Sequence, residues 1–237
     1  MFRFDSVVRY SEIDADRYMT LPAVLDILQD CCTFHSEHLE IGIDYLKEHE
    51  RAWVLSAWQV VIDRYPKMGE KISAYTWPYE FKGFMGNRNF KIEDEAGNVI
   101  VYANSVWVYI NTATGRPVRV PQEVAEAYQL EPPFEMETAD RKIPLPDAME
   151  EKEQIRAGRF CIDTNQHVNN SKYVMMAEEY LPEDFKVREL RVEYKKAAVL
   201  GDMIYPKVKI KDHQAVVALE NEQGKPYAVV QFMEDAV

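Results

Sequence analysis

The sequence has few of the residues that build disulfide frameworks and metal centres. It holds three cysteines and five histidines in 237 residues. Cys31 and Cys32 are adjacent in a segment of helical pattern, where neighbouring side chains point apart. His35 and His38 offer only a weak match to metal-ligand spacing. Cys161 fits better as a small apolar strand residue than as a nucleophile. We therefore expect no disulfide framework, no metal and no cofactor.

Long apolar runs and net positive charge are also missing. Without a run of membrane-spanning length, no transmembrane helix and no membrane partner are expected. The first residues, MFRFDSVVRYSEID, have neither a signal-peptide pattern nor the Arg- and Ser-rich pattern of a transit peptide, which favours a cytoplasmic protein. The formal charge of −12 speaks against nucleic acid as a partner, because binding a phosphate backbone requires a basic surface.

The first half of the chain combines one long helical pattern with several strand patterns. Thr20 is suited to cap a helix and Pro22 to lie in its first turn. Apolar side chains then recur at helical spacing: Leu21, Val24, Leu25, Leu28, Cys31, Cys32 and His35. Strands are predicted at residues 2–11, 53–65, 72–79, 86–93 and 99–110, separated by turn residues. One helix followed by antiparallel strands predicts an α+β domain.

A change of composition separates this half from the next. Five prolines punctuate residues 121–154, and three glutamates near the end make it acidic. A short helix is predicted at residues 122–128, and the rest of the segment is interpreted as a linker.

The second half repeats the pattern of the first. Aligning Ile162-Asp163 with Ile13-Asp14 places His167 at the position of Tyr18 and aligns the two predicted helices. Later strand and turn patterns also correspond, with a turn glycine aligned to a turn glycine. Two tandem domains of the same fold are the economical interpretation.

The chemistry-bearing motif lies at the start of the second helix. Asp163, Asn165 and His167 alternate, which places them on one side of an extended segment. Asn169 and Asn170 can cap the helix that follows and ends before Pro182. This arrangement suits water attack on a carbonyl carbon, with an imidazole base and an oxyanion held by backbone N–H groups or an amide. The simpler alternative is a solvent-facing turn before a capped helix.

Several segments resemble one protein family. The motif D-x-N-x-H-V-N-N-x-x-Y, together with V-V-I-D-R-Y-P, M-G-N-R and S-V-W-V, is similar to stretches of the acyl-acyl-carrier-protein (acyl-ACP) thioesterases of plants and bacteria. The resemblance implies an α+β fold of two tandem hotdog domains, each a long helix wrapped by an antiparallel sheet. It gives an N-terminal acyl-binding domain at 1–120, a linker at 121–154 and a C-terminal catalytic domain at 155–237. Without a transit peptide, a bacterial member is expected.

The same resemblance implies roles for individual residues. Hydrolysis of acyl-ACP in fatty acid biosynthesis would use Asp163, Asn165 and His167. Plant members add a glutamate in a segment like Y-R-R-E-C, where this chain has Y-K-K-A-A, with Ala197 and Ala198 at the last two positions. Either Asp163 or a helix carboxylate such as Glu178 or Glu179 is expected to serve instead, or the rate is expected to be low. Glu179 joins the predicted catalytic set.

Further residues are predicted to bind substrate and carrier. Since Tyr18 replaces the histidine in the first repeat, one active site per chain is expected, and the first domain would house the acyl chain. The predicted substrate-binding residues are Leu25, Leu28, Val54, Ser56, Trp58, Asn169 and Asn170. The predicted carrier-docking residues are Lys82, Arg88, Lys195 and Lys196.

Other functions stay open on the sequence alone. One is an acyl-CoA thioesterase. Another is an acyl-binding module with weak or lost catalysis, and a third is a hotdog dehydratase, which the matched segments favour less. Edge strands also allow a homodimer.

Overall fold

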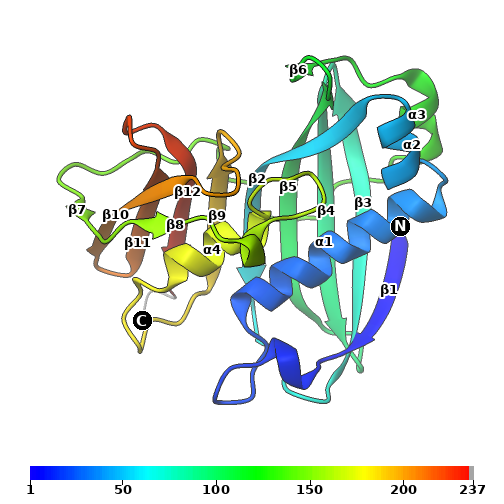
Figure 1. Ribbon diagram of the computed structural model, residues 1–237. Helices are drawn as coiled ribbons and strands as arrows, with labels where there is room; N and C mark the ends of the chain where they lie inside the picture. Colours follow the sequence, from blue (N-terminus) through cyan, green and yellow to red (C-terminus); the bar gives the residue numbers. More distant parts are fainter. Residues whose placement is uncertain (235–237) are drawn as a thin grey trace. The chain divides into compact units, whose positions relative to one another are not determined.

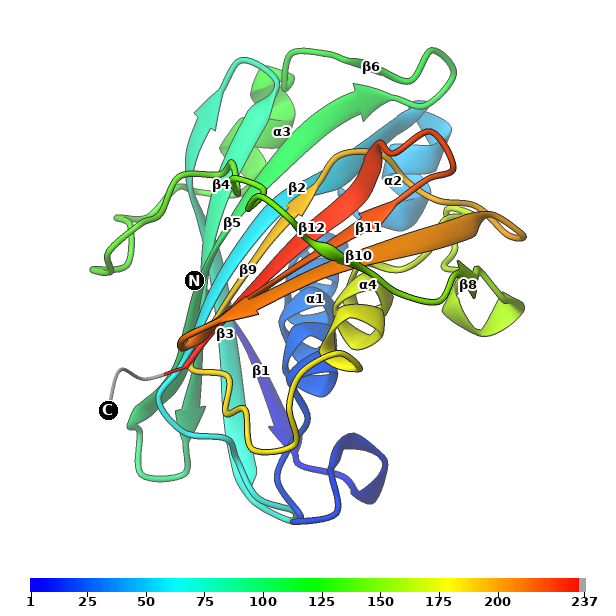
Figure 2. The same ribbon diagram turned by 90° about the vertical axis from the view of Figure 1, so that its left-hand side faces the viewer.

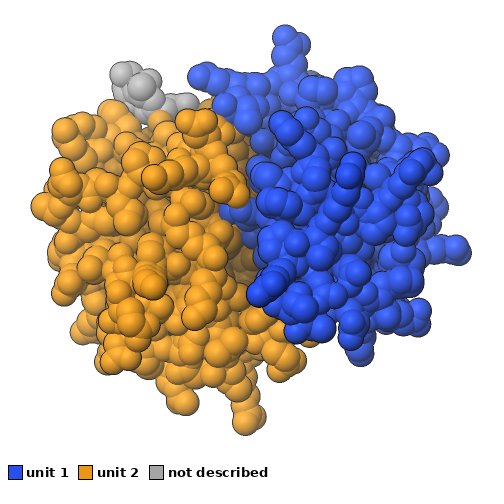
Figure 3. All heavy atoms as spheres, turned by 90° about the horizontal axis from the view of Figure 1, so that it is seen from above, with its two compact units in different colours: residues 1–56, 62–138 blue, residues 57–61, 139–237 orange. Residues whose placement is uncertain are grey.

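The structure of the chain is a computed structural model that describes residues 1–234 (Figure 1). Among these residues, no helix is both long and apolar enough to cross a membrane. The chain divides into two compact units, coloured separately in Figure 3. Unit 1 comprises residues 1–56 and 62–138, and unit 2 comprises residues 57–61 and 139–237.

Unit 1 is an antiparallel sheet with one long helix across it. The helix α1 (Leu21–His38) lies along one face of the strands, and it contacts β1 and β3 in particular (Figures 1 and 2). The strand order is β1 (Phe2–Val7), β3 (Lys71–Lys82), β4 (Met85–Asp94), β5 (Val99–Asn111) and the first half of β2 (Arg51–Ile62). Smaller elements are α2 (Ile43–Glu48), β6 (Arg116–Pro117) and α3 (Gln122–Ala127).

The start of α1 follows the capping signals of the sequence. Thr20 Oγ1 accepts a hydrogen bond from Ala23 N at 3.3 Å, and Pro22 lies in the first turn. All seven side chains of the predicted apolar stripe are buried. The predicted helix is therefore confirmed. The first strand ends earlier than predicted, at Val7, and a short 3-10 turn follows at Tyr10–Glu12.

The segment at 121–154 is mostly irregular, but it packs on both units. Its short helix α3 confirms the predicted one, and the Tyr128 side chain after it is buried among aromatic residues of unit 1. Trp77 Nε1 donates a hydrogen bond to Pro132 O at 2.9 Å. Ile143 is buried against unit 2 strands. Residues up to 138 belong to unit 1 and later ones to unit 2, so the domain borders given above stay a prediction.

Unit 2 repeats the plan with a shorter helix. Its strand order is β9 (Glu189–Tyr194), β12 (Pro226–Met233), β11 (Gln214–Glu220), β10 (Met203–Lys211) and β7 (Glu150–Glu151). The short strand β8 (Ile155–Arg156) also pairs with β10. Residues Ala57–Val61 of β2 pair with β9. The helix α4 (Asn170–Glu178) contacts β11 and β12. It ends at Glu178, four residues before the predicted stop at Pro182.

The turn that leads into α1 and the turn that leads into α4 each contain the same pattern of internal hydrogen bonds. Asp14 N donates to Tyr18 O at 2.9 Å, and Asp163 N donates to His167 O at 2.8 Å. In each turn the aspartate Oδ1 also accepts from the backbone N–H four residues on, at 2.9 Å from Tyr18 and 3.3 Å from His167. The internal repeat noticed in the sequence therefore extends to the backbone geometry of the two turns.

Candidate active site

The candidate site is built on a tight turn between the 3-10 helix Arg159–Cys161 and α4. Asp163 Oδ1 accepts hydrogen bonds from Asn165 N at 2.8 Å and from His167 N at 3.3 Å. Gln166 adopts a positive φ of 63°, a conformation that costs a non-glycine residue energy unless its surroundings hold it. The Asp163 carboxylate is thus bonded to the backbone of the turn, and these bonds fix the position of the His167 main chain.

His167 presents its ring to solvent from this fixed backbone. Its main chain pairs with Val199, and the next residue, Val168, donates from its N to Ala198 O at 2.9 Å. The His167 side chain is exposed and makes no hydrogen bond or ion pair with any other described residue. An imidazole is the side chain best suited to exchange protons near neutral pH. His167 therefore presents an accessible imidazole without a bonding partner in the described chain at this turn.

Asn165 and Asn169 have different roles in the structure. Asn169 caps α4: its Oδ1 accepts from Ser171 N at 2.9 Å and Ser171 Oγ at 3.0 Å, and its O accepts from Lys172 N at 3.0 Å. Two of the helix-start N–H groups expected to hold an oxyanion are therefore already occupied. Asn165 is exposed, and its side-chain amide has no partner in the described part of the chain. Of the two oxyanion donors considered, the structure leaves the Asn165 amide available.

The buried Tyr173 and the half-buried Tyr194 lie beside this turn, and no role was predicted for either from the sequence. Tyr173 OH accepts from Ala198 N at 2.8 Å, and Tyr194 OH donates to Asn170 O at 3.0 Å. Their rings meet edge to face, with centroids 6.0 Å apart. Burial raises the pKa of both phenols, so both stay neutral. They connect the start of α4 to the segment that pairs with His167.

The structure does not bring Glu179 to this turn. It is the exposed C-cap residue of α4, and His167 lies before the other end of that helix. Nine residues of α-helix separate the two ends by about 13 Å. Ala197 is exposed and Ala198 buried, and both hydrogen-bonding groups of the Ala198 backbone are in use. At the end of α4 near His167, therefore, no glutamate of this helix takes the place of the carboxylate that plant members carry at the Ala197 position.

Glu178, beside it, is mostly buried and has no hydrogen-bond or ion-pair partner among residues 1–234. Burial first, and the charge of Glu179 second, raise the pKa of this carboxyl from its usual 4.5 to about 7. Since the folded protein holds the proton more tightly than the unfolded chain, Glu178 contributes stability at low pH that is lost as the pH rises through about 7.

We expect Glu178→Gln to stabilise the protein above neutral pH. Discounted for partial exposure, the gain in free energy of unfolding is about 1–2 kcal/mol at about pH 8, with no gain near about pH 4. Urea unfolding of the variant and of wild type across this range measures it. The exposed Glu183→Gln is the control, and equal pH slopes for all three proteins would contradict the prediction.

The predicted acyl-binding residues are spread over different environments. Leu25 and Leu28 are buried on α1, Trp58 is buried on β2, and Ser56 is half-buried. Val54 is 44 % exposed. None of the five lines either of two cavities in unit 1, one of about 840 Å³ and one of about 50 Å³. The smaller cavity is lined instead by aromatic and polar side chains that were not predicted to bind the acyl chain: Trp53, Phe81, Trp107, Tyr128, Ser36 and Arg88.

One predicted docking residue is in the wrong place. Arg88 is only 7 % exposed, because its guanidinium hydrogen-bonds inside unit 1 and lies 5.0 Å from the Tyr128 ring centroid. It cannot contact a carrier protein at the surface. Lys82, Lys195 and Lys196 are exposed, and Lys195 Nζ forms an ion pair with Glu193 at 2.7 Å.

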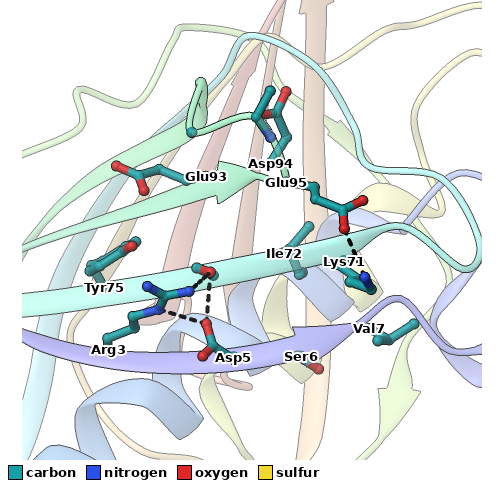
Figure 4. Close-up of a pocket in the computed structure, with 13 residues that line it drawn as sticks. Arg3, Asp5, Ser6, Val7, Lys71, Ile72, Tyr75, Glu93, Asp94 and Glu95 are labelled. Carbon is teal, nitrogen blue, oxygen red and sulfur yellow. Dashed lines mark hydrogen bonds and ion pairs between the residues drawn. The ribbon is translucent and has the colours of Figure 1, made fainter.

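A hollow in the surface of unit 1 is lined by charged side chains that all take part in ion pairs. It measures about 840 Å³ and lies over β1, β3 and β4 (Figure 4). Its cations are paired with its own carboxylates, Arg3 with Asp5 at 2.7 Å and Lys71 with Glu95 at 2.7 Å. Nothing in it calls for a charged ligand. Residues 1–234 also contain no group of three or more His, Cys, Asp or Glu side chains able to hold a metal.

Comparison with known proteins defines the class and then the family. Over 98 % of its length the chain shares the fold of an acyl-ACP thioesterase from Bacteroides thetaiotaomicron (TM-score 0.88, 23 % identity, 96 % of that chain). The chain also shares the fold of the 12:0-ACP thioesterase from Umbellularia californica, with a TM-score of 0.83 and 20 % identity over 98 % of this chain and 96 % of that chain. The fold is thus the α+β tandem hotdog fold predicted above.

The sequence comparisons identify the family. Residues 1–128 match the acyl-ACP thioesterase N-terminal domain, and residues 146–231 match the acyl-ACP thioesterase C-terminal domain. The chain therefore belongs to the acyl-ACP thioesterase family. The chloroplastic palmitoyl-acyl carrier protein thioesterase of Cuphea hookeriana is 31 % identical over 205 residues, 80 % of this chain and 49 % of that protein. The chain spans about half the length of the curated relatives it matches first.

Proposed function

We propose that this chain hydrolyses the thioester of acyl-ACP to a free fatty acid and holo-ACP, in fatty acid biosynthesis. The observation that carries the proposal is the exposed His167 ring on a turn that Asp163 and an isolated backbone bridge to Val199 hold in place. Family membership and the names of the relatives, which are acyl-ACP thioesterases and hydrolases, support the choice of substrate.

The proposed reaction needs a base and an oxyanion donor. His167 takes a proton from water, whose oxygen forms a bond to the thioester carbon, and the Asn165 amide donates to the oxyanion. The intermediate collapses with cleavage of the C–S bond. The thiol of the leaving group has a pKa of about 8.5, so the thiolate leaves readily and takes the proton back from the imidazolium. Asp163 acts by positioning His167 and Asn165 through their backbone N–H groups.

Restoring the missing glutamate tests whether a carboxylate near His167 assists the proposed reaction. Ala197 is exposed, two residues before the Val199 that pairs with His167, so a longer side chain fits there without displacing the core. We expect Ala197→Glu to raise kcat by about tenfold, because a carboxylate near the imidazole favours its protonated form in the transition state. Ala197→Gln is the matched control. An unchanged kcat in both variants would mean that this site works without a carboxylate there.

The choice between carrier protein and coenzyme A is tested by one comparison. Exposed Lys82, Lys195 and Lys196 offer local positive charge on a chain of net charge −12, and carrier proteins are acidic. Steady-state hydrolysis of matched acyl-ACP and acyl-CoA substrates should give the higher kcat/KM for acyl-ACP. A higher value for acyl-CoA would favour an acyl-CoA thioesterase. Binding of acyl-ACP without turnover would favour a binding module.

The cellular setting and assembly are part of the same proposal. The curated relatives are chloroplastic by name, whereas the fold is shared with the thioesterase from Bacteroides thetaiotaomicron, and we place this chain in a bacterial cytoplasm. Fractionation of the source cells tests the location. Light scattering of the purified chain decides between a monomer and a homodimer.

A further inference from the structure

The segment that pairs with His167 in unit 2 has fewer backbone hydrogen bonds to its turn than the equivalent segment of unit 1. In unit 1 two such bonds, of 2.8 and 2.9 Å, flank the bridge at Tyr18. In unit 2 the described chain has one of the two, from Val168 N to Ala198 O at 2.9 Å. The exposed His167 ring has no hydrogen bond or ion pair with a described residue, so its position depends on this backbone.

Side chains supply further bonds to this segment of unit 2. Asp202 Oδ2 accepts a hydrogen bond from Val199 N at 3.0 Å, and the same oxygen accepts one from Tyr227 OH at 3.0 Å. Asp202 N also donates to Val199 O at 3.1 Å, which closes a short turn. On the other side, Tyr173 OH accepts from Ala198 N at 2.8 Å. Three side chains therefore hold the two residues that lie opposite the turn of the candidate site.

The two tyrosine hydroxyls have no counterpart at the equivalent positions of unit 1. Tyr227 O accepts two backbone hydrogen bonds from the residues that follow β9, as Ile100 O does from those that follow β2. Tyr173 is the fourth residue after the N-cap of α4, and Val24 is the fourth after the N-cap of α1. An aliphatic side chain cannot form a hydrogen bond. The hydroxyls are thus found in the unit that carries the imidazole.

A carboxylate closes this turn in both units, but its other partners differ. In unit 1 Glu70 Oε2 accepts from Lys67 N at 2.9 Å, and the Arg64 guanidinium binds both oxygens of Glu70 at 2.6 and 2.9 Å. In unit 2 Asp202 has no ion pair with any described residue, and Tyr227 OH takes the place of the guanidinium. Burial first, and the bond to Asp202 second, raise the pKa of Tyr227 to about 12. The hydroxyl therefore keeps its proton and donates throughout the range in which a histidine titrates.

Small shifts of this segment reach the imidazole through the backbone. Where the flanking residues carry the hydrogen bond of an antiparallel bridge, the two opposed residues have Cα atoms about 4.5 Å apart, so Val199 lies directly against the His167 main chain. Catalytic groups have to be held within about 0.5 Å of their productive position. A displacement of about 1 Å can lower a rate by about a hundredfold. The bonds that hold Val199 therefore influence what the His167 ring can do.

We propose that Asp202, itself held by Tyr227, is a positioning residue for His167 and acts through the backbone of Val199. That the position of the imidazole matters for hydrolysis rests on the proposed function, whereas the bonds that hold the segment do not depend on it. Asp163 fixes the turn from within, and Asp202 fixes the segment on the opposite side of the bridge.

The first test compares the equivalent carboxylates of the two units by steady-state kinetics with acyl-ACP. Asp202→Ala should lower kcat by about tenfold and leave KM unchanged. Asp202→Asn should keep kcat within about threefold of wild type, because both bonds go to one oxygen and the amide retains an acceptor oxygen. Glu70→Ala is the control, and it should leave kcat within about twofold. Equal losses in Asp202→Ala and Glu70→Ala, or no rescue by asparagine, would overturn the proposal.

The second test needs no turnover. Amide hydrogen exchange of the intact protein, followed by NMR, reports on the bond from Val168 N to Ala198 O. In Asp202→Ala the Val168 N–H should exchange at least about tenfold faster than in wild type, and Tyr227→Phe should act in the same direction. Met19 N–H, its counterpart in unit 1, should exchange at the wild-type rate in both variants.

The two variants keep this test decisive. Tyr227→Phe leaves the bond between Asp202 and Val199 in place, so it decides the outcome if Asp202→Ala does not fold. Unchanged exchange at Val168 in Tyr227→Phe, or equally faster exchange in both units, would overturn the proposal. Faster exchange at Val168 alone, in a protein whose wild type does not hydrolyse acyl-ACP, would refute only the proposed function.

Discussion

His167→Ala should lower kcat for acyl-ACP by about 10²- to 10⁴-fold, with little change in KM, because the imidazole acts on water and not on the acyl chain. The variant should fold like wild type. The His167 side chain is exposed and unbonded, and its backbone contacts with Asp163 and Val199 do not depend on the ring. Single-turnover hydrolysis and thermal unfolding measure the two effects separately.

The internal repeat supplies the control for this experiment. Tyr18 occupies the equivalent position in unit 1, in a turn with the same backbone hydrogen bonds, and it is 36 % exposed. Tyr18→Ala should leave kcat within about twofold of wild type, as is usual for surface substitutions away from a site. Equal losses in both variants would show that turn stability and not the imidazole matters. No loss in either would remove His167 from the mechanism.

Much of the fold is predictable because its signals are local. The capping residue Thr20, the apolar spacing along α1 and the turn residues between strands act within a few positions of one another, and the structure has these elements close to where they are predicted. The predicted and observed elements differ mainly in where they end. The first strand stops at Val7 and α4 at Glu178, and element ends are the least certain part of any prediction from a single sequence.

The turn that carries the candidate site was predictable in position, but its hydrogen bonds were less so. The alternation of Asp163, Asn165 and His167 locates the turn, yet nothing in the pattern says that the Asp163 carboxylate binds backbone N–H groups. The burial of Arg88 and the unpaired N–H of Trp53 depend on strands and helices far apart in the sequence. A lysine or arginine beside a predicted turn carries no local mark of burial, so Arg88 was misassigned to the surface.

Asn165→Ala should lower kcat by roughly 10²- to 10³-fold, the loss typical of removing one oxyanion donor. The turn should persist, because Asp163 accepts from the backbone N of Asn165, which alanine retains. Asn165→Asp should be at least as damaging, since a carboxylate has no donor and repels the oxyanion. The ratio of kcat in the two variants, measured with saturating acyl-ACP, separates a lost donor from an added charge.

Asp16→Ala is the matched control, because Asp16 is the exposed residue at the equivalent position of the unit 1 turn. It should leave kcat unchanged. Wild-type turnover in Asn165→Ala would assign the oxyanion to a backbone N–H. If that group is Ser171 N or Lys172 N, both of which are bonded to Asn169, the cap of α4 would have to open during the reaction. Asn169→Ala distinguishes the two cases, because it frees Ser171 N but keeps the backbone O that accepts from Lys172 N. It should not raise kcat if the amide of Asn165 holds the oxyanion, and it should raise kcat if the freed Ser171 N–H does.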